Sequence, residues 1–435
     1  MTSSRPASDA PAPLTPPAAG GPAAAPPNAP VEKQGAAKLV VLMITAFVDM
    51  VGVLMVIPLL PFYVKTLGGN GVVLLGYHLG IGEITALIVS SFTVAQLVSA
   101  PLWGRFSDRF GRRPALMIAL FASMIAYVIF GYATSLWVLF LSRIVQGAGG
   151  GTVGVIQAYV ADATHPKDRA KSLGWLSAAT NAGVALGPVL GSQAMRLSKE
   201  GPGLIAAALC LVNVVFCGFF LTESHDVAAA RGAKKQPRTS RAAVARVVTH
   251  SGEPASRLIW IYAVAIGAFQ GVTSILALFL ADRFGVTAHT IGYFFMYIGI
   301  ISVLTRAVIL GRLVDWLGEA KLSRIGLVLM ALGLGALPLT TNYWQLALAV
   351  ALMPLGTAFT FPCVTAMLSR VISNEERGLY MGVQQTFGGA SRAIYPLVAG
   401  FTFDHLGIGV PFAISAALVA ATLLLGFDLE SYAKH

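Results

Sequence analysis

Charged residues are scarce in this chain of 435 residues, where they make up 11%, whereas hydrophobic residues make up 56%. Soluble domains carry about 25% charged residues. The shortage therefore excludes an ordinary soluble domain and favours a protein embedded in a lipid bilayer. The net charge of +11 is accompanied by no nucleic-acid-binding fold motif or aromatic pattern. We expect contact with lipid and no nucleic-acid partner.

Cysteine is also rare, and Cys210, Cys217 and Cys363 all lie in apolar segments without metal-ligand spacing. Cys210 and Cys217 are seven residues apart on one expected helix, about 10 Å by helical rise, which is too far for a disulfide. The seven histidines show no paired metal spacing. The chain has no phosphate-binding glycine loop and no serine or cysteine nucleophile constellation. We expect no metal, no cofactor and no enzymatic activity, and an ion gradient instead of ATP as the energy source.

Twelve apolar runs are long enough for bilayer-crossing helices, which need about 20 residues each. Six precede and six follow a polar segment, so we expect an all-α membrane protein of twelve transmembrane helices in two six-helix bundles. The spans are expected at 38–64, 80–104, 113–132, 135–163, 170–195 and 202–222, then at 257–283, 288–311, 321–340, 343–371, 378–403 and 408–429. The domains are then a first bundle (37–222), a basic cytoplasmic linker (223–256) and a second bundle (257–435).

The N-terminal segment differs from the rest, with nine prolines and nine alanines in the first 30 residues. Such a composition cannot bury a hydrophobic core, so we expect a disordered cytoplasmic tail over 1–36. The segment lacks the basic start and unbroken apolar core of a signal peptide. The first apolar span is therefore expected to be an uncleaved insertion signal.

Lysine and arginine predict the orientation, because the cytoplasmic loops of membrane proteins are enriched in them. With a cytoplasmic N-terminus, 23 of the 30 basic residues fall in inside segments, 4 in outside loops and 3 within spans. We therefore expect both termini and the linker on the cytoplasmic side of the plasma or inner membrane. The seven basic residues between 231 and 257 are interpreted as a topology anchor that also contacts anionic headgroups.

A charged turn bracketed by glycines occupies the same loop of both halves. Residues 104–111 read GRFSDRFG, and residues 311–318, which lie 207 positions later, read GRLVDWLG. This echo indicates an internal duplication. Membrane proteins built from paired repeats are typically transporters with the substrate path between the repeats.

These features and three further stretches resemble the major facilitator superfamily. Residues 143–162 resemble its fourth-helix signature, and residues 49–61, with their acid and paired prolines, resemble the first helix of tetracycline-type exporters. Residues 174–192 are similar to the fifth-helix signature of drug:proton antiporters, carried here by Gly174, Gly183, Gly187, Pro188 and Gly191. The resemblance covers 38–430. It implies the major facilitator fold, with two pseudo-symmetric bundles, and the drug:proton antiporter branch.

The resemblance is incomplete in two places. Tetracycline exporters carry an acid in the third span, whereas 113–132 holds none here, so tetracycline itself is not the expected substrate. The second loop copy continues into Glu319-Ala320 where the first has paired arginines, so the second copy is degraded.

Asp49 is the expected proton carrier. It lies about 16 Å from the cytoplasmic edge by helical rise, where an acid costs about 2.5–3.5 kcal/mol and normally faces a wet cavity or a partner. Arg143 lies at nearly the same depth from the opposite side. Because the resemblance places the first and fourth helices side by side, we expect the two to interact, directly or through water. The alternative is a fixed ion pair that only orients two helices. Glu83, near the outer end of the second span, is a competing carrier, while Asp282 and Asp404 are expected to be solvated.

The loop between the second and third spans has a mechanical interpretation. Its glycines permit tight turns, and Asp108 is expected at the amide-rich N-terminus of the eleventh helix, with Arg112 paired to Asp162. The resemblance implies that these contacts latch the halves in the outward-open state; a role in topology alone is the alternative. The latch residues are Gly104, Asp108, Arg109, Gly111, Arg112 and Asp162.

The fifth-span glycines Gly183, Gly187 and Gly191 share one helical face, and a small-residue face allows close approach of another helix. The resemblance places this face between the halves, where it would prevent a proton leak; generic packing is the alternative. Pro188 removes a backbone hydrogen bond and can bend the helix.

Substrate contacts are expected from polar or aromatic residues on cavity helices, although packing is an alternative for each. The candidates are Gln146, Gln157, Tyr159, Phe269, Gln270, Gln384, Gln385, Phe387 and Arg392. Such a cavity suits a lipophilic compound, cations included, better than a sugar or a dicarboxylate.

These observations together favour a monomeric, proton-coupled efflux carrier for a small lipophilic compound that works by alternating access. Its expected partners are the substrate, protons and the bilayer. A secondary importer or facilitator on the same fold is one alternative. A transporter-like sensor that binds ligand without net transport is another.

Overall fold

The computed structural model describes residues 31–74, 76–165, 168–223, 240–373 and 375–426. Most of the expected N-terminal tail and residues 224–239 of the expected linker lie outside this part. The first helix already begins at Val31, inside the range expected to be a tail.

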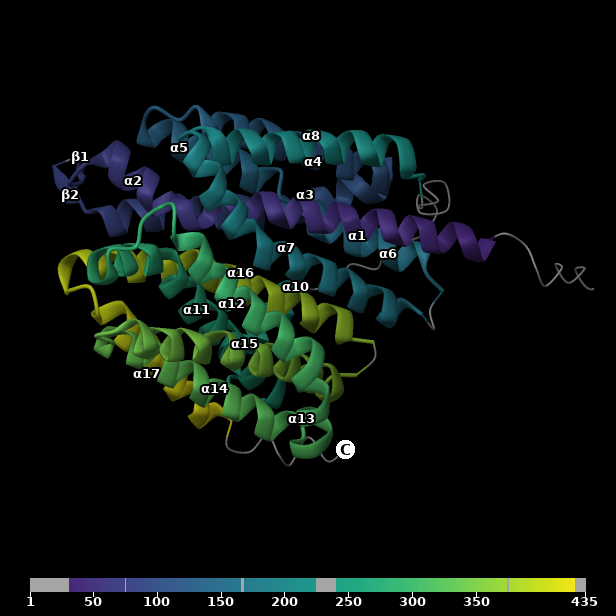
Figure 1. Ribbon diagram of the computed structural model, residues 1–435. Helices are drawn as coiled ribbons and strands as arrows, with labels where there is room; N and C mark the ends of the chain where they lie inside the picture. The colour runs from purple at the N-terminus through teal and green to yellow at the C-terminus, as the bar shows by residue number, and fades with distance from the viewer. Residues whose placement is uncertain (1–30, 75, 166–167, 224–239, 374, 427–435) are drawn as a thin grey trace, which may run out of the picture.

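The first half of the described chain is a bundle of long helices that alternate in direction (Figure 1). Its elements are α1 (Val31–Val56), α2 (Leu60–Gly68), β1 (Val72–Leu74), β2 (Tyr77–Leu79), α3 (Ile81–Phe110), α4 (Arg112–Gly131), α5 (Leu136–Ala148), α6 (Thr152–Ala163), α7 (Arg169–Leu197) and α8 (Gly201–Phe220). α1 and α2 together make the first span, which Pro58 and Pro61 interrupt because proline lacks a backbone N–H.

The second half repeats this arrangement. Its elements are α10 (Ser240–Thr249), α11 (Pro254–Phe284), α12 (Ile291–Leu304), α13 (Leu310–Leu317), α14 (Glu319–Ala336), α15 (Tyr343–Val371), α16 (Arg377–His405) and α17 (Val410–Leu425). α12 continues into α13 through a wider π turn at Thr305–Ile309, so the pair forms one span.

Ten helical segments within the described ranges are long and apolar enough to cross a membrane. The last two expected spans correspond to α16, which has 29 residues, and α17, which has 16. α16 packs on α11, and α17 packs on α14 and α11. Each of the twelve apolar runs is therefore helical, with ends close to the expected ones.

Two elements were not expected from the sequence. Val72–Leu74 and Tyr77–Leu79 pair as a short antiparallel sheet, β1–β2, with Val73 opposite His78. In the expected linker, Ser240–Thr249 forms α10, which contacts α11 and α16 and buries Val247 in the core of the second half. The linker is therefore partly an element of the second bundle.

The two halves lie side by side, the first purple to teal and the second green to yellow in Figure 1. We call the end that carries β1 and β2 the hairpin end, and the end that carries the turns at Gly111 and Gly318 the linker end. Across the halves, α3 packs on α16 and α7 packs on α12.

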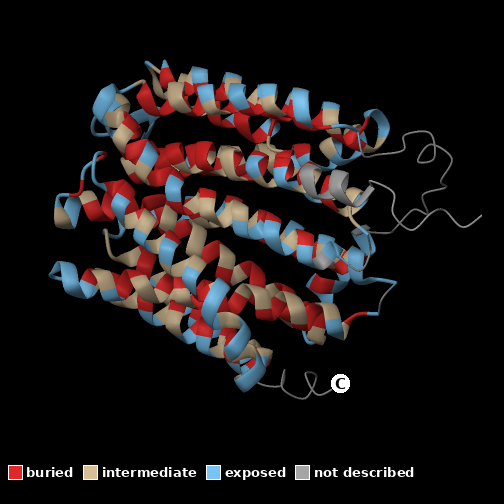
Figure 2. Cartoon of the chain, turned by 45° about the vertical axis from the view of Figure 1, so that its right-hand side comes forward, coloured by how far each residue is buried: buried red, intermediate tan, exposed pale blue. Residues whose placement is uncertain are grey.

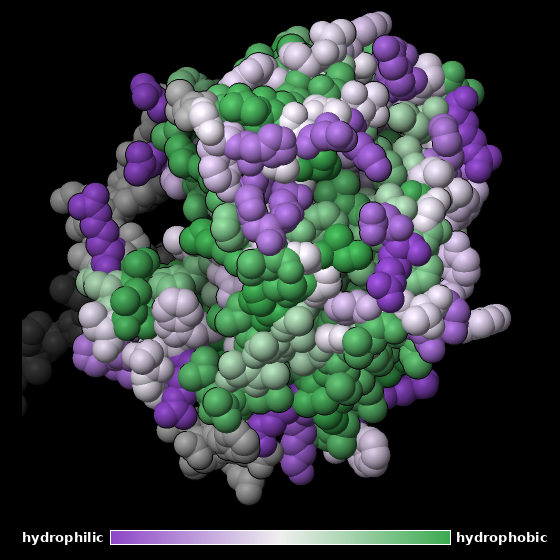
Figure 3. Space-filling view, turned by 90° about the vertical axis from the view of Figure 1, so that its left-hand side faces the viewer, coloured by the Kyte–Doolittle hydropathy of each residue, from purple (hydrophilic) through white to green (hydrophobic). Residues whose placement is uncertain are grey.

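Burial follows the bundle geometry, with buried residues between helices and exposed ones along the outside (Figure 2). Large apolar side chains such as Phe219, Trp316 and Trp344 are exposed there, as expected for a surface that contacts lipid. Seen from the hairpin end, hydrophilic side chains gather on parts of that face with hydrophobic ones around them (Figure 3).

Candidate functional site

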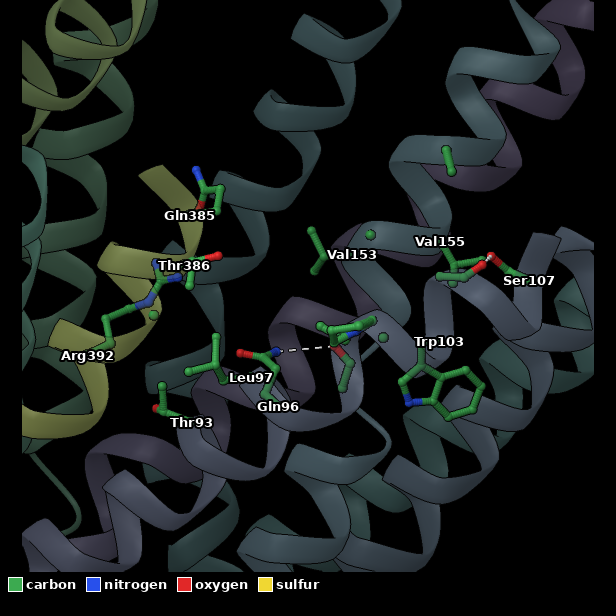
Figure 4. Close-up of a pocket in the computed structure, with 18 of the residues that line it drawn as sticks. Thr93, Gln96, Leu97, Trp103, Ser107, Val153, Val155, Gln385, Thr386 and Arg392 are labelled. Carbon is green, nitrogen blue, oxygen red and sulfur yellow. Dashed lines mark hydrogen bonds between the residues drawn. The ribbon is translucent and has the colours of Figure 1, made fainter. Parts of the chain in front are cut away.

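A cavity lies between the two halves. Three pockets of about 590, 630 and 510 Å³ share lining residues, so they are parts of one space. Val153 lines all three pockets, and Gln96, Gln385 and Arg392 each line two. In Figure 4 the α16 side chains lie on one side of the space and Gln96 of α3 on the other. The size is that of ordinary small-molecule sites, about 300–1,000 Å³.

The fourth span is broken where it meets this cavity. Three consecutive glycines, at 149–151, separate α5 from α6. A Cβ at Gly151 would lie 2.7 Å from Cβ of Trp103, and the Trp103 indole donates to the carbonyl of Ala148 at 2.6 Å. Gln96 donates to the carbonyl of Gly150 at 3.2 Å (Figure 4). Glycine here allows α3 to press against the break, and α6 then starts at Thr152.

Asp49 lies in the wall of the cavity. Its side chain is 2% exposed, and it lines the second pocket with Thr180 of α7 and Met381 of α16. The Thr152 hydroxyl donates to Asp49 Oδ2 at 2.7 Å. A buried carboxylate is costly when ionised, and here one neutral hydroxyl donates to it, so its charge depends on how much water reaches it.

Arg143 is equally buried, but it lies in the third pocket. Its guanidinium carbon lies 5.1 Å from the centre of the Phe130 ring, its Nε lies 3.4 Å from the Ser142 hydroxyl, and its Nη2 has no hydrogen-bond partner. Asp49 and Arg143 form no ion pair within the described part of the chain. The direct contact expected from the sequence is therefore not made in this state.

Glu83 lies away from the cavity, at the hairpin end. Its carboxylate accepts from the backbone N–H of Gly80 at 3.0 Å and from the Tyr77 hydroxyl at 3.1 Å. It also lies 3.3 Å from His405 Nε2 of the second half. Desolvation, together with the hydrogen bond to Glu83, raises the pKa of Tyr77, so this phenol remains protonated as a donor.

The expectation that Asp404 is simply solvated is wrong. Its carboxylate accepts from the backbone N–H groups of Gly82 at 3.1 Å and Glu83 at 2.7 Å. An acid of the second half therefore caps the N-terminus of α3 in the first half, where exposed amides and the helix dipole favour an anion.

Five of the nine expected substrate residues line the cavity, and they are Gln146, Gln157, Gln270, Gln385 and Arg392. The other four lie elsewhere. Tyr159 donates to the carbonyl of Thr222, and Gln384 donates to Thr365 at 3.3 Å. Phe387 packs edge-on against Trp260, and Phe269 packs against the apolar core. Successive side chains point in different directions around a helix, so Gln385 lines the cavity while Gln384 does not. Predicting where a span lies does not say which of its residues face the cavity.

Arg112 is the centre of the expected latch. It donates to Asp108 Oδ1 at 2.9 Å, to Asp162 Oδ2 at 3.0 Å and to the Ser107 hydroxyl at 2.6 Å. The pairing of Arg112 with Asp162 is thus present. Contact between Asp108 and the start of α16 stays a prediction for another state.

The remaining latch residues have separate surroundings. Gly111 has a φ of +106°, which favours glycine. Gly104 lines the first pocket and faces open space. Arg109 is exposed, with its guanidinium carbon 5.3 Å from the Phe110 ring centre.

The expectation that the fifth-span glycines face the other half is wrong. A Cβ at Gly183 would lie 2.5 Å from the carbonyl oxygen of Phe47, and Gly187 and Gly191 pack on the same helix, α1 of the same half. Gly174 faces open space. The neighbouring face of α7 meets the second half instead.

That contact uses glycines of α12. The carbonyl of Pro188 lies against Gly292, whose N–H donates to the Ser192 hydroxyl at 2.9 Å, and a Cβ at Gly299 would lie 2.7 Å from the Cα of Ala185. The glycine spacing in α12 was the available signal, but the sequence does not say which helix such a face meets.

Comparisons with known proteins agree with this geometry. The family model described as Major Facilitator Superfamily matches residues 42–322 and 258–434. The chain belongs to the major facilitator superfamily. It is a transport protein of the membrane and not an enzyme.

Relatives resemble the chain over most of their length. The tetracycline resistance protein, class C, of Escherichia coli is 30% identical over 356 residues, covering 79% of this chain and 84% of that protein. Multidrug resistance protein 2 of Bacillus subtilis (strain 168) is 26% identical over 389 residues, covering 88% and 93%. The crystal structure of the human organic anion transporter MFSD10 (TETRAN) superposes with a TM-score of 0.68 at 22% identity, covering 90% and 99%.

Proposed function

We propose that this protein exports a small lipophilic compound in exchange for protons by alternating access. Export is supported by relatives that are named for tetracycline and multidrug resistance and that align with most of this chain. The observation that carries the proton role is the burial of Asp49 in the cavity wall, with the Thr152 hydroxyl as its donor. An intramembrane acid in such a setting is a functional-site candidate.

The proton cycle follows from solvation. While water reaches the cavity, the Asp49 carboxylate can ionise; when the halves close over it, the neutral acid is favoured. Because the donor Thr152 follows the glycine break, movement of α6 against α1 changes the hydrogen bond and the hydration together. Arg143 lies in the adjoining pocket, where its charge also favours ionisation. Glu83, held at the hairpin end, is assigned to closure of that end.

The basic residues support an orientation with both termini in the cytoplasm. The linker end is then cytoplasmic, the hairpin end is external, and the two bundles at 37–222 and 257–435 rock about the cavity as a monomer of twelve spans. In this orientation the network of Arg112, Asp108 and Asp162 lies at the cytoplasmic end, where it is available to latch the outward-open state.

Transport in proteoliposomes tests the proposal. Liposomes containing a pH-sensitive dye are given an imposed pH gradient, and a panel of lipophilic compounds is screened for compound-dependent proton movement. Asp49→Asn should abolish this movement, whereas Asp282→Asn should not, because Asp282 is an exposed acid at the hairpin end. Thermal unfolding should show that both variants fold.

Each result has a distinct meaning. Unchanged proton movement in Asp49→Asn refutes the assigned carrier. Solute flux without proton movement in the wild type supports a facilitator, and binding without flux supports a sensor.

A further inference from the structure

The charges along the cavity are unbalanced. Four charged side chains line the three pockets: Asp49, Arg112, Arg143 and Arg392. Arg112 is neutralised by Asp108 and Asp162. Asp49 lies in the second pocket and accepts from Thr152. Among the described residues, the third pocket is therefore lined by two arginines and by no acid.

Neither of these arginines is paired with an acid within the described part of the chain. Arg143 is 2% exposed, and its Nη2 has no partner. Arg392 makes no hydrogen bond or ion pair with any residue in the part of the chain that the structure describes. It lies near the middle of α16, and it lines the first and third pockets together with Gln96 of α3. In Figure 4 its side chain runs along α16 toward Thr386. Cations at such depth are rare and mark substrate pathways or partners.

Arg392 also lies where the cavity ends. The next residue, Ala393, accepts a hydrogen bond from the Ser90 hydroxyl of α3 at 2.7 Å. This contact joins the halves directly after Arg392, which is the last residue of α16 that lines any of the three pockets. A ligand group in the third pocket can therefore reach this guanidinium.

The rest of the third pocket is amphipathic. Five glutamines line it, at positions 96, 146, 157, 270 and 385. Its apolar wall is built from Val53, Ile57, Leu60, Val89 and Phe92. Glutamine amides and guanidinium groups donate hydrogen bonds to carboxylate or sulfonate oxygens, and charge-assisted bonds are the stronger ones. The apolar wall takes the lipophilic body.

From this arrangement we propose that the third pocket binds an amphipathic organic anion, with its carboxylate or sulfonate on Arg392 and its apolar body on α1–α3. This inference rests on the proposed function, which makes the cavity the binding site of the exported compound. It replaces the cation allowed by the sequence with an anion, because Asp49, the one unpaired acid among the described residues that line the three pockets, lies in the second pocket and is hydrogen-bonded to Thr152.

Equilibrium binding tests the charge preference without requiring transport. Three dansyl probes share one ring system: dansylglycine is an anion, dansylamide is neutral and dansylcadaverine is a cation. Binding to the protein in nanodiscs of zwitterionic lipid is followed by tryptophan-sensitised dansyl emission, with empty nanodiscs as the blank. Dansylglycine should bind about tenfold more tightly than dansylamide, as expected for a charge-assisted contact.

Variants locate the site. Arg392→Gln should weaken dansylglycine about tenfold and leave dansylamide unchanged, while Arg392→Lys should keep part of the preference. Arg370→Gln is the matched control, because Arg370 is exposed and paired with Glu319 outside the cavity. If Arg392→Gln does not fold, the relative affinities of the three probes for the wild type and for Arg392→Lys still test the proposal.

Four results would overturn the proposal: equal affinities for the three probes, tightest binding of dansylcadaverine, an anion preference that survives Arg392→Gln, or no binding of any probe. These failures differ from failure of the proton assay. Anion-selective binding without proton movement keeps this inference and refutes only the coupling.

Discussion

The hairpin end and the linker end of the molecule are held in different ways. At the hairpin end, hydrogen bonds cross between the halves: Asp404 caps α3, and Ser192 accepts from Gly292. At the linker end, the network of Arg112 with Asp108 and Asp162 stays within the first half. The first pocket, which includes Arg112, lies on this side. Within the described residues, the hairpin end is therefore tied across the halves, whereas the Arg112 network ties the linker end inside the first half. Farther along α7, Arg306 in the π turn after α12 donates to Asn181 across the halves at 3.2 Å.

This difference shows how one chain can alternate. Contacts that cross the halves must break for the hairpin end to open, whereas contacts within a half can persist in both states. A transporter of this kind needs two arrangements of similar free energy. Modest contacts such as helix caps and glycine packing suit this need, because each is worth only a few kcal/mol or less.

The largest effect should come from wedging the hairpin end. A Gly292→Leu side chain would meet the carbonyl of Pro188 and the Ser192 hydroxyl, which lies 2.6 Å from the built Cβ. Overpacking costs about 1–3 kcal/mol, so the closed state should lose about 5- to 150-fold in population, and turnover should fall. The measurement is transport rate in proteoliposomes.

Gly311→Leu is the matched control for this wedge, because Gly311 follows in the same span and faces open space. Equal loss of turnover in the two variants would mean that the contact between α7 and α12 does not gate the hairpin end.

A smaller effect is expected from removing the cap that crosses the halves. Asp404→Ala leaves two N–H groups of α3 without their acceptor. Loss of a cap costs about 0.5–2 kcal/mol, which should raise the population open at the hairpin end about 2- to 30-fold. The readout is labelling of Thr93→Cys, in the cavity wall, by an impermeant maleimide added at the hairpin side, with Cys210, Cys217 and Cys363 replaced.

Asp282→Ala removes an exposed acid from the same end and should leave this labelling unchanged. If Asp404→Ala also leaves it unchanged, the cap does not hold the end closed.

The last pair of variants concerns the stability of the fold instead of transport, and it compares two glycines of α7. Gly174, near the linker end, faces open space, whereas Gly183 packs on α1. Gly174→Ala should stabilise the protein by about 0.5–1 kcal/mol, because alanine favours a helix interior. Gly183→Ala should destabilise it by about 1–3 kcal/mol through overpacking. Thermal unfolding in detergent measures both, and a stabilising Gly183→Ala would contradict the packing described here.

The sequence was sufficient to locate the spans and to pick out charged residues whose place inside the membrane is energetically costly. Apolar runs located the helices because the bilayer requires about 20 such residues. Asp49 and Arg143 stood out because charges at membrane depth are expensive, and Arg392 was a candidate as a polar residue on an expected cavity helix. All three line the cavity.

The sequence could not predict which side chains pair with one another or which helix a given helix face packs against. Asp49 accepts from Thr152 instead of pairing with Arg143, and the glycine face of α7 meets α1 instead of the second half. A stripe of small residues shows that some helix comes close, but not which one. The cap from Asp404 joins residues more than 300 positions apart, so no local sequence pattern predicts it.

The most direct test of alternating access is a pair of distances measured by electron–electron double resonance. One spin-label pair spans the hairpin end, at Lys199 and Leu339, and the other spans the linker end, at Arg109 and Arg370; all four positions are exposed. Opposite changes are predicted when conditions move from those that ionise Asp49 to those that neutralise it, or in Asp49→Asn: one distance lengthens as the other shortens. Two distances that stay fixed, or that lengthen together, would contradict the account.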